Sequence, residues 1–212
     1  EPLEVHHLAS TRAEKIEKVT AALEAAGLKP PADFLHRYPQ QLSGGQRQRV
    51  VIASALVLNP SYLVADEPVS MLDVSIRAEI LNLLLNLRNE HNITMVYITH
   101  DLASAAYIAD RVAVMYLGTI VEIGPAEAVL DDPRHPYTKA LMSVIPVPNP
   151  RQRKKRIVLK GETPNPINLP TGCRFHPRCP EAIPSCSVNE PKLENLGDNH
   201  QAACLLVGQE SL

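Results

Sequence analysis

Two short apolar segments separated by an amphipathic helix place the strongest constraint on the fold of this chain. SYLVADEP (61–68) predicts a strand that ends in two acids, and ITMVYITHD (93–101) predicts a buried strand that ends at a histidine. Because a helix over 75–92 connects these strands, we expect them to pair in parallel in a doubly wound α/β sheet. The apolar stripe of this helix consists of Ile76, Ile80, Leu83, Leu84 and Leu87.

The composition is that of a folded protein, and it argues against two classes. Hydrophobic residues make up 45% of the 212 residues, which is enough for a core. The formal net charge of -2 argues against a nucleic-acid partner held by bulk electrostatics. The longest apolar run, Val50–Leu58, is far shorter than the roughly 20 residues that a membrane-spanning helix needs. We therefore expect a cytosolic chain or one held at a membrane by other subunits.

Proline and cysteine are unevenly distributed along the chain. Prolines recur every few residues from Pro125 onward, and all four cysteines lie in the last fifth. We expect a helical part over 1–60, a sheet-containing core over 61–146 and a Pro/Cys-rich extension over 147–212.

Acidic and imidazole side chains follow the two predicted strands. Asp66 and Glu67 end the first strand and His100 ends the second. In open parallel sheets, ligands bind beyond the carboxyl ends of the strands. One carboxylate can hold Mg²⁺ and the other can activate a water for attack on a phosphoryl group, with the histidine beside them. The same residues are also compatible with a helix-capping turn and an ordinary surface histidine.

The glycine pair Gly44-Gly45 stands between Ser43 and Gln46, at the start of a predicted helix that ends near Leu58. Glycines at a helix start let backbone N–H groups approach an anion, which the helix dipole also favours. Ser43 can donate to a phosphate or cap the helix. A capped helix without a ligand is the alternative.

Taken in order, LSGGQRQR, YLVADEP, SMLD and ITHD resemble the ATP-binding-cassette (ABC) ATPase family over about residues 1–125. The resemblance implies a partial P-loop NTPase sheet with a helical subdomain in 1–60, and ATP and Mg²⁺ as cofactors. Met71 departs from the small residue common at its position. The implied roles are ATP contact for Ser43, Gly44, Gly45, Gln46 and Asp73, magnesium binding for Asp66, base catalysis for Glu67 and the switch histidine for His100.

The P-loop that this family needs, G-x-x-x-x-G-K-[ST], has no match in the chain, since none of the nine glycines precedes a lysine. We therefore expect the chain to be the carboxyl-terminal part of a longer protein. In the family, two ATPase units pair head to tail and each signature loop closes on ATP held by the other unit. On that basis the fragment alone binds ATP weakly or not at all and is inactive.

The tail carries a second resemblance. HPYTKAL followed by GCRFHPRCP is similar to the carboxyl-terminal extension of ATPase subunits of oligopeptide and dipeptide importers, over about residues 131–206. This resemblance implies an ATPase that drives peptide import at the cytoplasmic face of the membrane. Its implied partners are a second ATPase subunit, identical or homologous, transmembrane permease subunits and, indirectly, an extracytoplasmic peptide-binding protein.

The four cysteines predict a metal site, because structural disulfides are disfavoured in the cytosol. Their spacings are not the paired C-x₂-C of structural zinc, and wide loops suit a four-thiolate iron–sulfur cluster. The importer resemblance implies a [4Fe–4S] cluster, and zinc or unligated thiols are the alternatives. The residues concerned are Cys173, Cys179, Cys186 and Cys204.

Two other functions remain open at this stage. One is an ABC ATPase of chromosome, repair or translation systems, although such proteins lack the HPY extension and often carry long coiled-coil insertions. The other is a catalytically inert fragment with a metal-binding tail.

Overall fold

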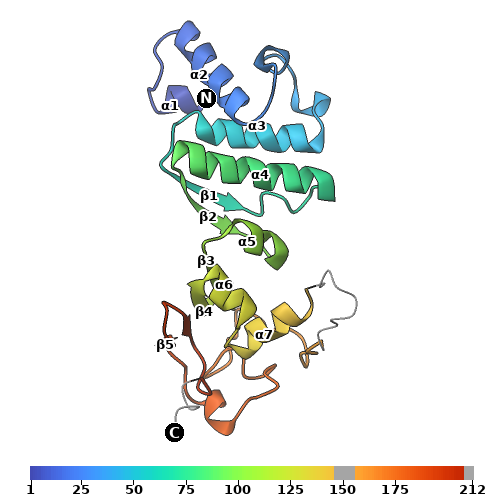
Figure 1. Ribbon diagram of the computed structural model, residues 1–212, viewed down its shortest axis with the longest axis vertical. Helices are drawn as coiled ribbons and strands as arrows, with labels where there is room; N and C mark the ends of the chain where they lie inside the picture. Colours follow the sequence, from blue (N-terminus) through green and yellow to red (C-terminus); the bar gives the residue numbers. More distant parts are fainter. Residues whose placement is uncertain (146–155, 208–212) are drawn as a thin grey trace. The chain divides into compact units, whose positions relative to one another are not determined.

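The computed structural model describes residues 1–145 and 156–207, which form two compact units (Figure 1). The chain divides between Asp101 and Leu102. The junction expected between 146 and 147 falls outside the described residues. The division comes earlier because a strand of the tail, β6 (Gln201–Ala202), pairs with β4 (Thr119–Pro125) and so joins the tail to the hairpin before it.

The first unit consists of helices and a strand pair. The amino end of helix α2 (Arg12–Ala25) is closed by a capping box, in which Thr11 and Glu14 each accept the other's backbone N–H. Past its carboxyl end, Gly27 adopts the left-handed backbone, as the sequence predicts. The other helices of this unit are α1 (Pro2–Val5), η1 (Pro31–Asp33), η2 (Pro39–Gln41), α3 (Gly44–Leu56) and α4 (Val74–His91).

Strands β1 (Tyr62–Asp66) and β2 (Thr94–Ile98) pair in parallel, which confirms the expected crossover through α4. Their burial alternates, however, so that one face of the pair is exposed. The expectation that the second strand is fully buried was therefore wrong, because α4 lies toward only one face (Figure 1). The exposed face carries Tyr62, Val64, Val96 and Ile98.

Helix α4 supplies much of the core of this unit. Its apolar stripe is confirmed for Ile80, Leu84 and Leu87, which are almost fully inaccessible to solvent. Each such side chain contributes about 1.5–3 kcal/mol of burial free energy. Ile76, at the amino end of the stripe, contacts Gly45 of α3, so the first turns of α3 and α4 lie against each other.

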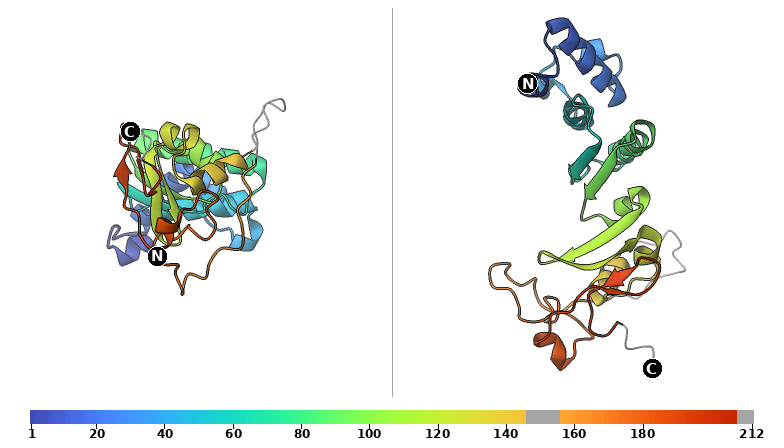
Figure 2. Two further views of the ribbon diagram at one scale, coloured as in Figure 1. Left: turned by 90° about the horizontal axis from the view of Figure 1, so that it is seen from below. Right: turned by 90° about the vertical axis from the view of Figure 1, so that its left-hand side faces the viewer.

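The second unit contains a four-stranded antiparallel sheet with the order β3-β4-β6-β5. Strand β3 (Arg111–Tyr116) and β4 form the hairpin predicted around Gly118, whose backbone is left-handed (Figure 2). The remaining elements are α5 (Leu102–Ile108), α6 (Ala126–Asp131), α7 (Pro136–Ser143), η3 (Pro184–Ser187) and β5 (Glu194–Asn195).

An aromatic cluster joins the HPY segment to the cysteine-containing tail. Phe175, which is buried, packs edge-on against Tyr116 with ring centroids 5.2 Å apart and against Tyr137 at 5.3 Å. Pro136 begins α7 as predicted, and His135 caps that helix by accepting the N–H of Tyr137 at its Nδ1. The HPY segment therefore both begins a helix and packs against the cysteine-containing tail.

Glu122 is fully buried and joins three parts of this unit. Its carboxylate accepts the backbone N–H groups of Arg134 at 2.7 Å and His135 at 3.0 Å. Nε2 of His200, next to β6, donates to the same carboxylate at 2.7 Å. Three donors offset the cost of burying the charge, and they tie the start of α7 and the tail to β4.

We predict that the second unit loses stability in mild acid through His135. Burial, and to a lesser extent the charge of Lys139, lowers the pKa of the His135 imidazole from 6.5 to about 4. Between these values the unfolded chain binds a proton that the folded chain does not, so stability falls as the pH drops through this window. The expected loss between pH 7.5 and pH 5 is about 2 kcal/mol.

Urea unfolding at the two pH values measures this effect. His135→Asn keeps a capping side chain and should remove this part of the pH dependence, whatever it does to stability at pH 7.5. His36→Asn alters an exposed histidine and serves as the control. An unchanged pH dependence in the His135 variant contradicts the prediction.

Candidate functional site

The structure brings Glu67 and His100 into direct contact. Glu67 follows β1 and His100 follows β2, and the Nδ1 of His100 lies 2.9 Å from Oε1 of Glu67. Because the carboxylate can only accept, Nδ1 donates, and Nε2 is left for another partner. The side chain of Glu67 is 47% exposed and that of His100 is 74% exposed, so a ligand can reach both.

Asp66 and Glu67 diverge at the end of β1. Asp66 is the last residue of β1, on the exposed face beside Ile98 in register. The next residue, Glu67, has a left-handed backbone with φ of 44°, which is uncommon for a residue with a side chain. Its N–H donates to the carbonyl of Ile98 at 2.9 Å, so the strand pairing itself holds the turn. The two acids are therefore available for different tasks.

Ser43 and Gln46 form a capping box at the start of α3. The Ser43 hydroxyl accepts the N–H of Gln46 at 3.2 Å, and the Gln46 side chain accepts the N–H of Ser43 at 3.0 Å. Gly44 and Gly45 are the first two helical residues, whose N–H groups have no acceptor within the helix. Those two N–H groups are the donors that an anion can use at this helix start.

The two glycines of this site have different physical reasons to be glycine. A Cβ on Gly45 would lie 2.7 Å from Cγ2 of Ile76, closer than packed carbons approach. A Cβ on Gly44 would lie 3.7 Å from Leu72, which is an ordinary contact, and Gly44 is exposed. Gly45 thus allows α3 to approach α4, whereas Gly44 leaves the surface open. The sequence alone did not separate these roles.

The loop between β1 and α4 is anchored at both ends. The Ser70 hydroxyl donates to the carbonyl of Glu67 at 3.1 Å, and Asp73 caps α4 by accepting the N–H of Ile76 at 3.1 Å. Between these anchors Met71 is 97% exposed. The loop therefore presents a large apolar side chain to its surroundings from a defined position.

Arg77, in the first turn of α4, is a residue that the sequence reasoning missed. Its guanidinium bonds the carbonyl of Leu72 at 3.4 Å and the carboxylate of Asp101 at 3.2 Å. The only signal in the sequence is its position four residues after the capping Asp73, and that spacing does not indicate the contact with Asp101.

The four cysteines lie in the second unit as free thiols. Within the described residues, no three histidine, cysteine or acidic side chains form a group that could hold a metal ion. Burial raises the pKa of Cys179 to about 11, and burial followed by the neighbouring thiols of Cys186 and Cys204 raises the pKa of Cys173. The N–H of Cys173 donates to the carbonyl of Cys186 at 2.8 Å. The backbones of Cys173 and Cys186 are thus in contact, but in the described part of the chain the predicted arrangement of four thiols around one metal centre is not formed.

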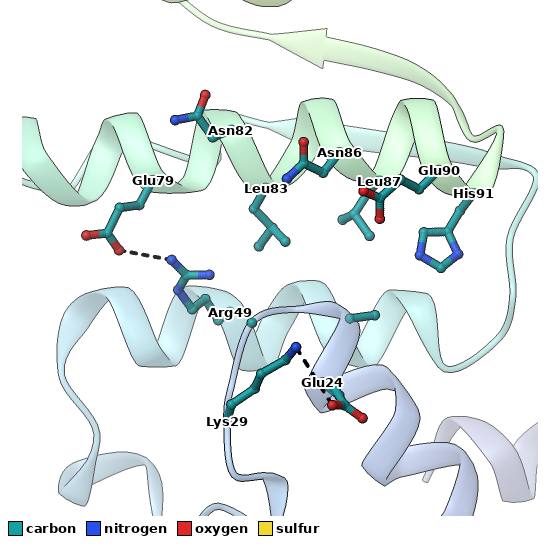
Figure 3. A pocket seen from close by; sticks show the side chains of 12 residues that line it. Glu24, Lys29, Arg49, Glu79, Asn82, Leu83, Asn86, Leu87, Glu90 and His91 are labelled. Carbon is teal, nitrogen blue, oxygen red and sulfur yellow. Dashed lines mark hydrogen bonds and ion pairs between the residues drawn. The ribbon is translucent and has the colours of Figure 1, made fainter.

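A cleft of about 580 Å³ in the first unit lies away from these residues, between the end of α2, α3 and α4 (Figure 3). On its wall Arg49 bonds the carbonyl of Ala26 at 3.1 Å and the carboxylate of Glu79 at 2.9 Å. Lys29 pairs with Glu24 at 3.7 Å. Since its charged groups are largely paired with one another, this cleft is a structural joint between helices.

Comparison with known families gives two matches. Residues 3–70 match the ABC transporter family, and residues 121–186 match the family described as Oligopeptide/dipeptide transporter, C-terminal region. The glycine pair and the acids after β1 fall in the first match, and the HPY segment falls in the second.

Individual relatives cover nearly the whole chain. YkfD of Bacillus subtilis (strain 168), named for oligopeptide transport, is 49% identical over 97% of this chain and 63% of its own length. The Dipeptide transport ATP-binding protein DppF of Haemophilus influenzae is 49% identical over 96% of this chain and 62% of its own length. The chain thus spans somewhat less than two thirds of the length of these relatives.

The fold agrees with a solved cassette. The structure of cbiO1 from Clostridium perfringens, titled as part of the ABC transporter complex cbiONQ, has a TM-score of 0.53 and 31% identity. The match covers 62% of this chain and 51% of that chain. The chain therefore has the α/β fold of an ABC ATPase cassette. Over nearly its whole length the chain is similar to ATP-binding proteins named for oligopeptide and dipeptide transport, and two of its segments match the ABC transporter family and the C-terminal region of oligopeptide/dipeptide transporters.

Among the helices that the structure describes, none is both long enough and apolar enough to cross a membrane.

We predict that the glycine pair responds unequally to substitution. Gly45→Ala should destabilise the first unit by about 1–3 kcal/mol, because the new methyl group overlaps Ile76. Gly44→Ala should cost less than about 0.5 kcal/mol, because its Cβ would make only an ordinary contact with Leu72 at 3.7 Å. Urea unfolding of both variants measures the difference. Gly45→Ala should cost less stability in a protein that already carries Ile76→Ala than in the wild type, because the overlapping side chain is then absent. Equal costs in the two backgrounds contradict the proposed overlap.

Proposed function

We propose that this chain is the carboxyl-terminal part of an ATP-hydrolysing subunit that drives peptide import. The observation that carries the proposal is the 2.9 Å contact between Glu67 and His100. This contact lies at the carboxyl ends of two parallel strands, and Glu67 directly follows Asp66 in the sequence. This edge is where α/β proteins bind nucleotides. The similarity to ATP-binding proteins of peptide transporters supports the same assignment.

Glu67 acts as the general base in this proposal. It is half exposed, held by its backbone bond to Ile98, and can accept a proton from a water that attacks the terminal phosphate. His100 donates a hydrogen bond from its Nδ1–H to Glu67, so its Nε2 is left for a contact with the substrate or water. In the neutral form Nε2 accepts a hydrogen bond from water, and in the protonated form it donates to a phosphate oxygen.

Asp66 is the magnesium residue of the proposal. Its exposed carboxylate, next to Glu67 and at the end of β1, is the hard oxygen donor that Mg²⁺ prefers. Bound there with its waters, the ion would offset the charge of the phosphates. One carboxylate is a small part of a magnesium shell, so the remaining oxygens come from water and phosphate.

The helix start at Ser43–Gln46 makes the second contact with ATP. The N–H groups of Gly44 and Gly45 point out of the first turn of α3, and the helix dipole favours a phosphate there. The capping box holds this turn in place without a ligand, so it is preorganised. Asp73 supports the neighbouring start of α4, and we assign the loop before it to contact with a second ATPase subunit.

Peptide transport, the partners and the location are assigned by family. The HPY segment and the tail after it match a region named for oligopeptide and dipeptide transporters. We therefore propose a second ATPase subunit, identical or homologous, and transmembrane permease subunits as partners, with a peptide-binding protein acting through the permease. This assembly places the chain at the cytoplasmic face of the membrane.

The exposed apolar face of β1 and β2 indicates that a further segment of protein covers these strands. Parallel strands are normally covered on both faces, and two strands alone are marginal. Here Tyr62, Val64, Val96 and Ile98 leave an apolar stripe in contact with solvent. We propose that the part of the longer relatives that this chain does not span covers this stripe and supplies the P-loop, so that the chain alone binds ATP weakly and does not hydrolyse it.

The test compares the whole subunit, in its assembled transporter, with the chain by itself. The whole subunit should hydrolyse ATP, and Glu67→Gln should lower the turnover number by at least about 100-fold while ATP binding is kept, because only the base is lost. Glu79→Gln alters an acid that pairs with Arg49 in the cleft between α3 and α4, and it should leave turnover nearly unchanged.

Two results contradict the proposal. If Glu67→Gln keeps the full turnover number, Glu67 is not the general base. An ATP affinity of the chain alone that equals that of the whole subunit contradicts the claim that the P-loop lies elsewhere. Calorimetry with Mg-ATP measures the affinity, and phosphate release measures turnover.

We also retain the iron–sulfur cluster as a separate proposal. The donor set fits in kind, since a [4Fe–4S] cluster takes four thiolates, but the four thiols do not converge on one point in the described residues. Binding would therefore require them to close in and to lose their protons, which burial disfavours in the absence of a metal. What supports the proposal is the donor set itself, four free thiols in the second unit.

Anaerobic purification tests the cluster. If the proposal holds, the protein is brown and contains about four iron and four acid-labile sulfide per chain. Cys186→Ser should lose the colour, and Ser185→Ala, which changes the adjacent residue, should keep it. Colourless protein with one zinc per chain, or without metal, contradicts the cluster.

A further inference from the structure

We infer that Arg77 is a positioning residue that couples the loop Ser70–Asp73 to the segment that carries His100. This inference rests on the proposed function, because it concerns the same catalytic edge. It assigns to Arg77 no contact with substrate. What it adds is a physical connection between two site segments that lie far apart in the sequence.

The connection is made by one guanidinium. Nη2 of Arg77 donates to the carbonyl of Leu72 at 3.4 Å, and Nη1 donates to Oδ2 of Asp101 at 3.2 Å. Leu72 lies inside the loop before α4, and Asp101 directly follows His100. The planar guanidinium fixes the directions of both bonds together, which a lysine ammonium cannot do.

These contacts close a ring around the candidate base. Glu67 receives a hydrogen bond from His100 at its side chain and one from Ser70 at its carbonyl. The ring therefore runs from Glu67 to His100 and Asp101, across Arg77 to the loop, and back through Ser70. A displacement of the loop changes either the Arg77 contacts or the position of His100 relative to Glu67.

The side chain of Arg77 is partly enclosed. Arg77 is 34% exposed and Asp101 is 30% exposed. Nε of Arg77 is buried and has no hydrogen-bond partner in the part of the chain that the structure describes, so the contacts of this guanidinium with Asp101 and Leu72 are made by its two Nη atoms. Partly exposed ion pairs add little to global stability. The effect of this pair is therefore expected in the geometry of the site more than in the folding free energy.

The functional consequence follows from the exposed tip of the loop. Met71 stands at this tip and is nearly fully accessible, so a surface that docks there will push on the loop. Because Arg77 bonds both the loop and Asp101, a displacement of the loop also displaces Asp101 and the adjacent His100. Docking at the loop is in this way linked to the orientation of the imidazole beside Glu67.

Kinetics in the whole subunit test the coupling. Arg77→Gln should lower kcat by about tenfold and leave the KM for ATP within about twofold, because a coupling contact is lost and no ATP contact is removed. Arg88→Gln removes the same charge near the other end of α4, where the side chain bonds its neighbour Asn89, and should leave both constants unchanged. Asp101→Asn should resemble Arg77→Gln.

The double variant separates coupling from independent damage. If Arg77 acts through Asp101, then Arg77→Gln with Asp101→Asn should lower kcat by little more than either change alone. If the double variant lowers kcat by the product of the two single effects, the inference is contradicted. A kcat of Arg77→Gln equal to that of Arg88→Gln also contradicts it.

A measurement on the chain alone supplies a readout besides activity. In amide NMR spectra, Asp101→Asn should shift the signals of Ser70–Asp73, and Arg77→Gln should shift both this loop and Thr99–Asp101, whereas Arg88→Gln should shift neither. If Asp101→Asn leaves the loop signals in place, the inference fails. If the whole wild-type subunit shows no ATP hydrolysis, the proposed function fails instead, and the NMR result still decides whether the connection exists.

Discussion

The parallel pairing of β1 and β2 is the constraint on which the candidate site depends. Glu67 and His100 are far apart in the sequence, and they meet only because both strands end at the same edge. The pairing continues one bond past the strand ends, from the N–H of Glu67 to Ile98. That bond holds Glu67 in a left-handed backbone and separates its side chain from that of Asp66.

The junction of α3 and α4 supplies the other half of the site. Gly45 removes the side chain that would hold the two helices apart, and Ile76 occupies the space. Both helices begin at this junction, one capped by Ser43 and the other by Asp73. Two helix starts with their N–H groups and dipoles are therefore neighbours, next to the loop that Arg77 connects to the strand edge.

The second unit is organised by burial of polar groups as much as by apolar packing. Glu122 is inaccessible to solvent, and its three donors come from the segment before α7 and from the tail. Phe175 brings the cysteine-containing segment onto the same hairpin. Because these contacts join segments far apart in sequence, the compositional shift at the prolines did not indicate that the hairpin and the tail form one unit.

The sequence by itself predicted α2, α3, α4, the strand pair, the hairpin and the start of α7, and it indicated which residues are candidates for the site. Apolar periodicity, glycine and capping residues are local signals, so they predicted α3, α4, the crossover and the hairpin, and the ordered motifs indicated an ABC ATPase. Only the tertiary structure decided which groups meet: the Glu67–His100 bond, the different roles of the two glycines, the Arg77 bridge and the separate thiols. The physical reason is that these contacts depend on how helices and strands pack, and a local pattern carries no record of its distant partner.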